Sequence, residues 1–410
     1  MKKNPALKQI TMPRREVPPT AGLPVKWRDF APRKIDFARA LSDCLEIPEP
    51  ILCCSGTAAL VVALKVLAED SSRDKVIVPA FSCPLVVLAI VNCGLKVELC
   101  DTASSHFDFN FSRLQTLADE RTLAIIPTHM GGCLADMVAT KNIAQTVGAY
   151  VIEDAAWATG AKKNGQSIGL MGDIGFFSLA VGKGLTSFEG GVLFTSSDAL
   201  RQRLNIAAKK LLPVNGWWEL RRIFEFISYA LFYRPSMLPY VYGAAYRQAV
   251  KNNDWLTALG DRFSAKIPMH RLGGWRQGRA THALMRLNDF HETARARAKA
   301  RIKILKQIPQ IQIIDNAPGD DGVYPFIMVV FPSENCRDAV LHDLTPLGLG
   351  VSRLFTCALN EYDYLKLYIR SVDMPVASDF ARRLLTISNS PWLSDPQFEI
   401  IVASIKNALS

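Results

Sequence analysis

Short apolar runs alternate with helix-like stretches between residue 34 and about residue 200. Four runs rich in β-branched side chains, at 76–79, 97–100, 123–127 and 150–154, each end in proline or in polar residues. The segment 58–68 carries apolar residues at helical spacing. Strands that alternate with helices predict an α/β fold with a mainly parallel sheet covered on both faces. In such sheets ligands bind at the carboxyl ends of the strands, so functional residues are expected just after these runs.

The alternation stops between residues 211 and 260, where aromatic residues and arginines accompany an apolar segment. Residues 280–308 then predict one long basic helix. The tail alternates again, with a strand at 326–331 and an amphipathic helix at 398–409. We therefore predict an extended N-terminal arm (1–33), a large domain (34–295) that carries an aromatic and basic insert (211–260), and a small α/β domain (296–410).

Composition places the chain among packed globular proteins, with 49% hydrophobic and 21% charged residues. Its nine cysteines lack the paired Cys-x-x-Cys spacing of a zinc site, so we predict free thiols in a reducing compartment and no metal centre. The N-terminus carries no apolar run of a secretory signal, and no stretch approaches the ~18 apolar residues of a membrane-spanning helix. A cytoplasmic location is the expectation.

The positive charge is concentrated in one part of the chain. Residues 201–306 hold 21 Lys and Arg against 6 Asp and Glu, whereas the remainder holds 27 against 32. Such an excess suggests an anionic partner, which can be a phosphorylated substrate, an acidic lipid surface or nucleic acid. Nucleic acid is the least favoured of the three, because no recognition motif for it is present.

Three segments place small or polar residues where a predicted strand ends or a helix begins. Cys54-Ser-Gly-Thr precedes the helix at 58–68, and the free N–H groups of such a helix start can hold a phosphate, although a serine there is more often only a cap. Phe81 follows the first strand and is equally typical of an ordinary core residue. Glu153 and Asp154 end the fourth strand, where a carboxylate either caps a helix or holds a positive charge.

A fourth segment centres on Lys183, which stands between two glycines in an apolar run, five residues after Ser178. Most lysines are solvated surface charges. Burial among apolar residues removes that hydration, lowers the pKa of the amine and frees it to act as a nucleophile. Lys183 is therefore a candidate catalytic residue.

In this order, the four segments resemble the fold-type I enzymes that use pyridoxal 5'-phosphate, and most closely the DegT/DnrJ/EryC1/StrS family of sugar aminotransferases. The resemblance covers about residues 45–200 and returns at 374–387. His129-Met-Gly-Gly-Cys-Leu-Ala-Asp-Met also looks like the family's His-x-x-Gly-x-x-x-Asp-Met segment. The resemblance implies a large domain that binds pyridoxal phosphate and a small C-terminal α/β domain.

The resemblance also assigns a role to each motif residue. Lys183 would form the Schiff base with pyridoxal phosphate and, once substrate displaces it, carry the proton. Asp154 would keep the pyridine nitrogen of the cofactor protonated. Glu189 would belong to a turn that closes the lysine loop. The remaining cofactor contacts would come from Gly56, Thr57 and Ser178 to the phosphate, and from Phe81 stacked on the ring.

Two positions depart from the family pattern. Trp157 stands where the family usually has Gln or His beside the phenolic oxygen of the cofactor, so stacking or shape would replace a hydrogen bond. The family's Gly-x-Asn-x-Arg stretch, whose Asn reaches across the dimer to the phosphate, is not recognisable. Arg271 or Arg276 would take over that contact, or both are ordinary solvated arginines.

These observations predict a homodimeric aminotransferase. It would move an amino group from an amino acid, glutamate in our expectation, to a keto-sugar carried on a nucleotide or a lipid phosphate. One alternative is a pyridoxal enzyme of the same fold that does not transaminate; Lys183 argues against its dehydratase branch, in which family members have His instead. Another is a catalytically silent scaffold or regulator on a membrane surface. For the insert, a lid or dimer contact is favoured over a helix lying on the anionic inner face of a membrane.

Overall fold

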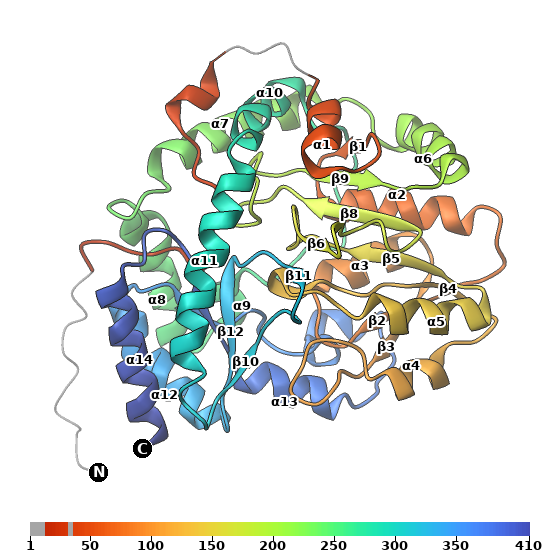
Figure 1. The fold of residues 1–410 in the computed structure, drawn as a ribbon. Helices are drawn as coiled ribbons and strands as arrows, with labels where there is room; N and C mark the ends of the chain where they lie inside the picture. The colour runs from red at the N-terminus through yellow and green to blue at the C-terminus, as the bar shows by residue number, and fades with distance from the viewer. Residues whose placement is uncertain (1–12, 32–35) are drawn as a thin grey trace.

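The centre of the computed structural model, which describes residues 13–31 and 36–410, is a seven-stranded sheet (Figure 1). β9 runs antiparallel to both of its neighbours, and the other six strands are parallel to one another. The predicted α/β sheet is thus confirmed. In spatial order the strands are β1 (Ile51–Cys53), β9 (Gly191–Phe194), β8 (Ile174–Ser178), β5 (Tyr150–Asp154), β4 (Thr122–Ile125), β2 (Lys75–Pro79) and β3 (Lys96–Cys100).

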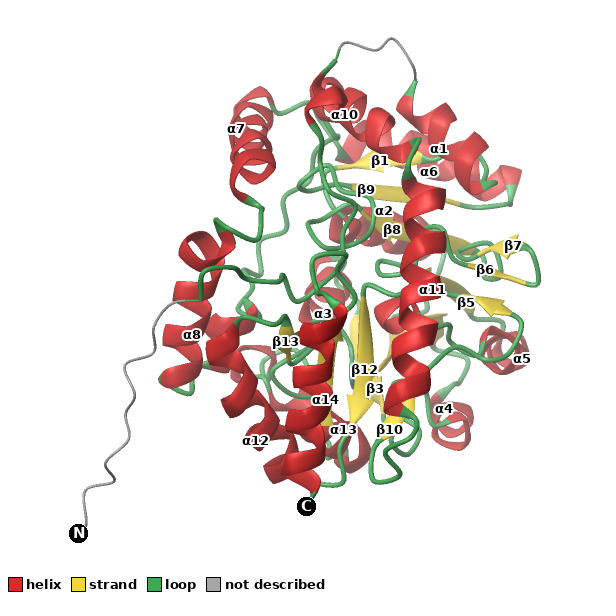
Figure 2. Cartoon of the chain, turned by 60° about the vertical axis from the view of Figure 1, so that its left-hand side comes forward, coloured by secondary structure: helices red, strands yellow, loops and turns green. Residues whose placement is uncertain are grey.

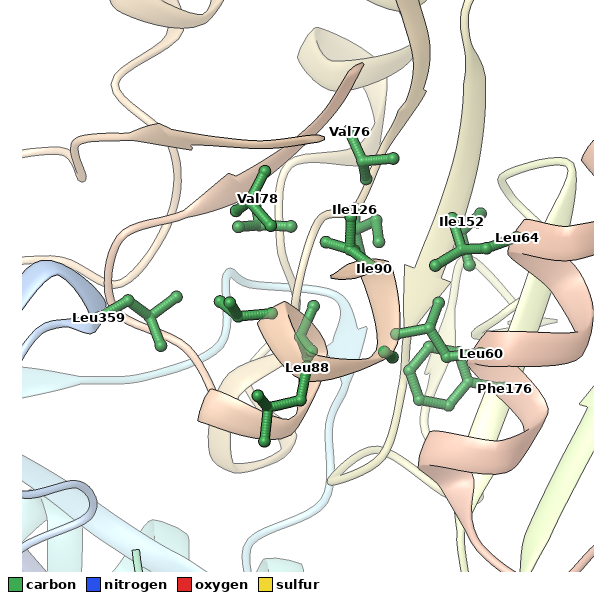
Figure 3. Packing of buried hydrophobic residues seen from close by; sticks show 14 of the residues in the cluster. Leu60, Leu64, Val76, Val78, Leu88, Ile90, Ile126, Ile152, Phe176 and Leu359 are labelled. Carbon is green, nitrogen blue, oxygen red and sulfur yellow. The ribbon is translucent and has the colours of Figure 1, made fainter. Parts of the chain in front are cut away.

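Helices cover both faces of this sheet, because successive side chains of each strand point to opposite sides. Val76 and Val78 of β2 pack with α2 and α3, whereas Ile77 between them packs with α4 and α5. Figure 3 shows the first of these layers, in which leucines of α2 and α3 meet β2 and β5. The helices around the sheet are α1 (Phe37–Leu45), α2 (Gly56–Ala68), α3 (Pro84–Asn92), α4 (Phe111–Leu117), α5 (Met137–Val147), α6 (Asp198–Leu211) and α10 (Gly274–Leu284).

A four-stranded antiparallel sheet forms the centre of the C-terminal part. Its strand β12 (Phe326–Val330) joins two cores, since Ile327 and Val329 pack under α11, α12 and α14 while Phe326 and Met328 belong to the main core. The boundary that we predict at 295–296 falls inside α11 and stays a prediction. The remaining elements here are β10 (Gln312–Ile314), β14 (Leu384–Ser388), β13 (Val351–Ser352), α11 (Leu287–Leu305), α12 (Glu334–Leu344), α13 (Pro375–Arg383) and α14 (Asp395–Leu409).

The insert folds into helices. Its first helix, α7 (Gly216–Phe232), lies at the edge of the molecule beside α10 (Figures 1 and 2). It is followed by a π-helical turn (Pro239–Gly243), α8 (Ala244–Lys251) and α9 (Trp255–Leu259). Among the described residues no helix is long and apolar enough to cross a bilayer. Short elements complete the chain: β6 (Lys162–Lys163), β7 (Gln166–Ser167) and β11 (Asp320–Asp321) form a small sheet, and 3-10 turns occur at Trp27–Phe30, Met130–Gly132, Thr345–Leu347, Leu359–Glu361 and Asp363–Leu365.

The prediction of one helix over 280–308 is wrong, because α10 ends at Leu284 and α11 begins at Leu287. Arg286 in the break has φ −113° and ψ 1°. Its guanidinium pairs with Asp29 at 2.5 Å and donates to the Pro24 carbonyl at 3.2 Å. The break therefore ties this part of the chain to the N-terminal segment. Of the predicted arm, residues 1–12 and 32–33 lie outside the described residues.

Candidate active site

A cavity of about 490 Å³ opens at the carboxyl ends of β5 and β8, where α2 begins. This is the edge at which a parallel sheet binds its ligands. Six of the seven residues assigned to cofactor contacts line it, together with residues from the N-terminal segment, the insert and the four-stranded sheet. The six are Gly56, Thr57, Asp154, Trp157, Ser178 and Lys183.

Lys183 lies in the loop between β8 and β9, residues 179–190, which we call the lysine loop. Gly182 and Gly184 on either side have φ of +83° and +79°, a conformation that favours glycine. A Cβ on Gly182 would also collide with the Thr20 hydroxyl of the N-terminal segment. Burial lowers the pKa of Lys183 to about 8, against the opposing effect of Cys83 and Asp154. A sizeable fraction of the amine is therefore neutral slightly above neutral pH.

The two carboxylates at the end of β5 point to opposite sides of the strand. Glu153 is fully buried, accepts hydrogen bonds from two loop amides at 2.9 and 2.5 Å, and meets His129 Nε2 at 3.0 Å. Asp154 lines the cavity and accepts one bond, from the Ala156 amide at 3.1 Å. Burial raises the pKa of Asp154, while the Ala156 amide and Lys183 oppose that rise. Glu153 and His129 are thus structural, and Asp154 is the carboxylate that faces a ligand.

The start of α2 forms a cradle for an anion. The Ser55 hydroxyl caps the helix by accepting from the Ala58 amide at 3.0 Å. The amides of Gly56 and Thr57, in the first turn, have no acceptor within the helix. A Cβ on Gly56 would lie 3.2 Å from the Ser178 Cβ, so the helix starts tightly against β8. Two amides and the Ser178 hydroxyl therefore lie at one place, an arrangement that suits a phosphate.

An aromatic ring does face the cavity, but it is not Phe81. Phe81 is fully buried and packs edge to face against Phe355 and Phe380, with ring centroids 5.4 and 5.0 Å away. The prediction that it stacks on a cofactor ring is wrong in this structure, because Phe81 lies in the core behind the cavity wall and is not part of that wall. Trp157 presents its ring instead, and Lys183 Nζ lies 3.3 Å from the centroid of that ring.

The far end of the lysine loop is held by charged side chains. Glu189 pairs with Arg222 of α7 at 2.6 Å and accepts from the Trp218 indole at 3.4 Å. Arg276 of α10 is fully buried, pairs with Glu219 at 2.5 Å and donates to carbonyls of the lysine loop. These contacts fix the loop from the outside.

Arg276 therefore cannot reach a partner subunit, and that prediction is wrong. Its side chain is 0% exposed, and its nitrogens are occupied by Glu219 and by backbone carbonyls. Arg271 is exposed and donates to the Leu212 carbonyl at 3.0 Å. A role of Arg271 at a dimer contact stays a prediction.

Several lining residues carried no signal in the sequence. Thr128 precedes His129, and its buried hydroxyl has no partner among the described residues. Arg353 donates from Nη2 to the Thr356 carbonyl at 2.9 Å, while its buried Nε has no such partner. Tyr242 and Asp261 come from the insert or just after it, where spacing gives no guide. The only signal in the sequence was the mixed aromatic and charged composition of the insert, which is compatible with a contact to a ligand site.

Asp261 shows how the end of the insert is anchored. One of its carboxylate oxygens accepts from the Thr356 amide at 2.7 Å, the Thr356 hydroxyl at 2.8 Å and the Tyr362 hydroxyl at 2.8 Å. Burial raises the pKa of Asp261 against these bonds. The end of the insert therefore forms part of the cavity wall. This position is compatible with the predicted lid.

The donor set fits pyridoxal phosphate. The cradle at α2 suits its phosphate, and the buried amine of Lys183 suits its aldehyde. The buried Asp154 lacks a full set of partners, so a protonated ring nitrogen facing it would supply one. Among residues 13–31 and 36–410 no group of three or more His, Cys, Asp and Glu side chains is arranged to hold a metal ion.

Comparison with known proteins agrees with this fit. Residues 21–215 match the DegT/DnrJ/EryC1/StrS aminotransferase family. The chain is 33% identical over 185 residues to GDP-perosamine synthase of Caulobacter vibrioides, covering 45% of this chain and 50% of that protein. It is 38% identical over 153 residues to the UDP-N-acetyl-3-dehydro-alpha-D-glucosamine 3-aminotransferase of Acidithiobacillus ferrooxidans, covering 37% of this chain and 41% of that protein. The matched part thus spans half or less of these curated relatives.

A solved structure extends the likeness to nearly the whole chain. Helicobacter pylori PseC, an aminotransferase involved in the biosynthesis of pseudoaminic acid, aligns with a TM-score of 0.73 over 96% of this chain and 99% of that chain. The sequence identity is 14%, so this likeness concerns the fold. It includes the C-terminal part, which the family match leaves out.

Proposed function

We propose that this chain is a member of the DegT/DnrJ/EryC1/StrS aminotransferase family, which its residues 21–215 match, and that it is a pyridoxal-phosphate-dependent aminotransferase. It would take an amino group from an amino acid, with glutamate as the proposed donor. The acceptor would be a keto-sugar carried on a nucleotide or a lipid phosphate.

One observation carries the proposal: Asp154, which is buried, and Lys183, which is half-buried with a desolvated amine, line the same cavity at the sheet edge where ligands bind. A charge removed from water is costly, and among the described residues neither side chain forms an ion pair that offsets this cost. Ionisable groups whose pKa is shifted by burial cluster at functional sites. Burial alone lowers the pKa of Lys183, so it is the shared position of Lys183 and Asp154 at the ligand edge that supports a functional role.

The chain's own residues would divide the chemistry. Pyridoxal phosphate, when bound, supplies an aldehyde that takes up the amino group and a protonated ring that withdraws electrons. Lys183 Nζ would accept the proton from the donor's α-carbon and, in the reverse sense, deliver one to the acceptor's carbon. Asp154 would hold the proton on the ring nitrogen. Gly56, Thr57 and Ser178 would bind the phosphate.

A phosphorylated sugar suits the rest of the cavity. Arg353 also lines the cavity, and its Nε has no hydrogen-bond partner among the described residues. Guanidinium groups of this kind bind phosphate or carboxylate oxygens. The names of the two matched enzymes, GDP-perosamine synthase and a UDP-sugar aminotransferase, support a nucleotide-linked sugar for them. We extend the same substrate class to this chain.

Assembly and location complete the proposal. We propose a homodimer in the cytoplasm that can also touch the inner face of an anionic membrane. The concentrated positive charge of residues 201–306 supports an anionic partner beyond the small substrate.

The proposal is tested by a single half-reaction. Purified protein loaded with pyridoxal phosphate is mixed with glutamate, and 2-oxoglutarate is measured against protein concentration. We expect about one equivalent of 2-oxoglutarate per active site without an acceptor, and continued formation when a nucleotide-linked keto-sugar is added. If no amino acid tried gave its matching 2-oxo acid (2-oxoglutarate for glutamate), an aminotransferase would be contradicted.

A further inference from the structure

One face of α7 carries large apolar side chains in solvent. Trp217, Leu220, Phe224 and Leu231 recur at intervals of three, four and seven residues, which places them on one side of the helix. Trp217 is 84% and Phe224 63% exposed, whereas Phe226 on the opposite side is buried. Figure 2 shows this helix at the edge of the molecule. Exposed apolar patches of this kind mark contact sites; we call these four residues the outer stripe.

The acidic side chains of α7 are paired with arginines, whereas one of its basic side chains is exposed. Glu219 pairs with the buried Arg276, and Glu225 pairs with Arg221 and Arg222. Both acids are thus neutralised on or beneath the helix, while Arg221 keeps 68% of its side chain exposed. The surface that α7 presents to solvent is apolar and basic.

A separate groove of about 390 Å³ lies at the end of α7, lined by Tyr229 and Ala230 on the side of the helix opposite to the outer stripe. Among the described residues that line it, Lys26 and Arg234 are charged and none is acidic. Arg234 lies over the exposed ring of Trp27, 5.9 Å from its centroid. The groove is otherwise mainly aromatic and proline-edged, with Phe30, Tyr229, Tyr233, Pro235 and Trp392.

The inner face of α7 contacts the lysine loop directly. Arg222 and Trp218 both bind the Glu189 carboxylate, at 2.6 and 3.4 Å. The ring of Tyr229 lies 6.2 Å from that of Phe188, whose φ of +69° is unusual for a bulky residue. The same helix therefore joins an uncovered apolar surface to the loop that carries Lys183.

We propose that the outer stripe docks on an anionic lipid surface and that this docking steadies the lysine loop through the inner face of α7. Tryptophan, phenylalanine and leucine next to arginine are typical of helices that lie in the membrane interface. A second copy of the chain is a poorer occupant, because a two-fold interface buries the same patch of both copies and would gather the basic side chains of both. The effect on the loop rests on the function proposed above for Lys183.

The expected effects follow from general magnitudes. Each exposed basic side chain near acidic lipid changes partitioning by roughly fivefold at low salt, and salt screens this effect. If docking requires the lysine loop in the conformation seen in this structure, lipid at about ten times its dissociation constant favours that conformation about tenfold.

Vesicle sedimentation tests the docking. Full-length protein loaded with pyridoxal phosphate is spun with phosphatidylserine-containing vesicles and with pure phosphatidylcholine vesicles, at low and high salt. The variant Trp217→Ser/Phe224→Ser is compared with the control Val138→Ser/Ile400→Ser, which changes exposed apolar residues on α5 and α14. We expect wild type and control to sediment with anionic vesicles at low salt only, and the α7 variant to bind at least about tenfold more weakly.

Two results would overturn the docking. One is failure of wild type to sediment at low salt, or equal binding to both vesicle types. The other is a combined result: wild type does not bind vesicles, and the α7 variant shifts from dimer to monomer in light scattering. The outer stripe would then be an interface between copies of the chain.

Hydrogen exchange tests the effect on the loop. We expect anionic vesicles to slow exchange of the backbone amides of residues 183–191 in wild type and control by about tenfold, and not in the α7 variant. Sedimentation without this slowing would refute the coupling. If instead the proposed function were wrong, wild type would bind vesicles but would show no amino transfer. In the absence of lipid, the α7 variant should keep its basal amino transfer.

Discussion

The cavity around Lys183 and the outer stripe of α7 depart in opposite ways from the usual distribution of side chains, although α7 contacts the loop that carries Lys183. In the cavity, charged groups are buried without full partners, as the lowered pKa of Lys183 and the raised pKa of Asp154 show. On α7, Trp217 and Phe224 are exposed although both are large and apolar. Buried polar groups and exposed apolar patches are the informative exceptions on a protein. The first kind indicates chemistry on a small molecule, and the second indicates contact with a surface.

The two regions meet at a buried ion pair. Arg276 bonds to Glu219 of α7 and to carbonyls of the lysine loop, so it belongs to both. Substitutions in the cavity should therefore change turnover, substitutions at the junction should change stability, and substitutions on the outer stripe should change neither.

The largest effect is expected for Lys183→Ala. It removes the proposed proton carrier, and such groups contribute about 10²–10⁴-fold, so amino transfer should fall by at least about 1,000-fold when the covalent contact is lost as well. Steady-state kinetics measures this, and circular dichroism verifies the fold. Lys162→Ala is the control, because Lys162 pairs with Glu46 away from the cavity at 2.6 Å. Turnover near the wild-type rate in Lys183→Ala would disprove its assignment.

Next in size is Arg276→Met, which acts at the junction. Removing one partner of a buried ion pair costs about 3–5 kcal/mol, because Glu219 and the loop carbonyls lose their donor. Urea unfolding should show this loss. Arg271→Met, at an exposed arginine five residues earlier, should change the free energy of unfolding by less than about 0.5 kcal/mol. Equal effects of the two variants would mean that the buried pair does not hold the loop.

Asp154→Asn should keep the cofactor but slow turnover. A neutral amide stabilises the protonated ring nitrogen less well, and a difference of ~2 pKa units in that pairing corresponds to roughly 2.7 kcal/mol, nearly a hundredfold in rate. Glu153→Gln is the matched control. It weakens the bonds to two loop amides and to His129, so it should lower thermal stability by about 1–3 kcal/mol instead. Unchanged rates in Asp154→Asn would favour a capping role.

The smallest effect on the isolated protein is expected for Trp217→Ser/Phe224→Ser. Both side chains are largely exposed, so the free energy of unfolding should stay within about 0.5 kcal/mol of wild type. Chemical denaturation in the absence of lipid measures it. A loss of several kcal/mol would mean that these side chains are packed in solution, and would remove the contrast between the two regions.

The sequence allowed much of the cavity to be predicted, because its polar residues stand next to strand ends and a helix start. Gly56, Asp154 and Lys183 are far apart along the chain, yet each follows or precedes an element whose pattern is clear. Parallel strands bring such ends to one edge, so local patterns sufficed.

Residues whose environment depends on distant segments could not be predicted. Phe81 follows a strand end as a ligand-stacking residue would, but Phe355 and Phe380 from the C-terminal part enclose it. Arg276 looked like a solvated arginine, and its partner Glu219 lies on another helix. The break between α10 and α11 contains neither Pro nor Gly, and it accompanies the contact of Arg286 with Asp29. In each case a tertiary contact overrode the local pattern.

The central claim, that Lys183 is a buried amine poised to react, is tested most directly by the pH dependence of its reaction with pyridoxal phosphate. Cofactor-stripped protein is mixed with pyridoxal phosphate at a series of pH values, and the rate at which the visible absorbance of the captured aldehyde appears is followed. Only the neutral amine reacts, so the rate rises with pH and levels off above the pKa of that amine. We predict a midpoint at about 8, absent from Lys183→Ala. A midpoint near 10.5, or the same capture in Lys183→Ala, would contradict the account.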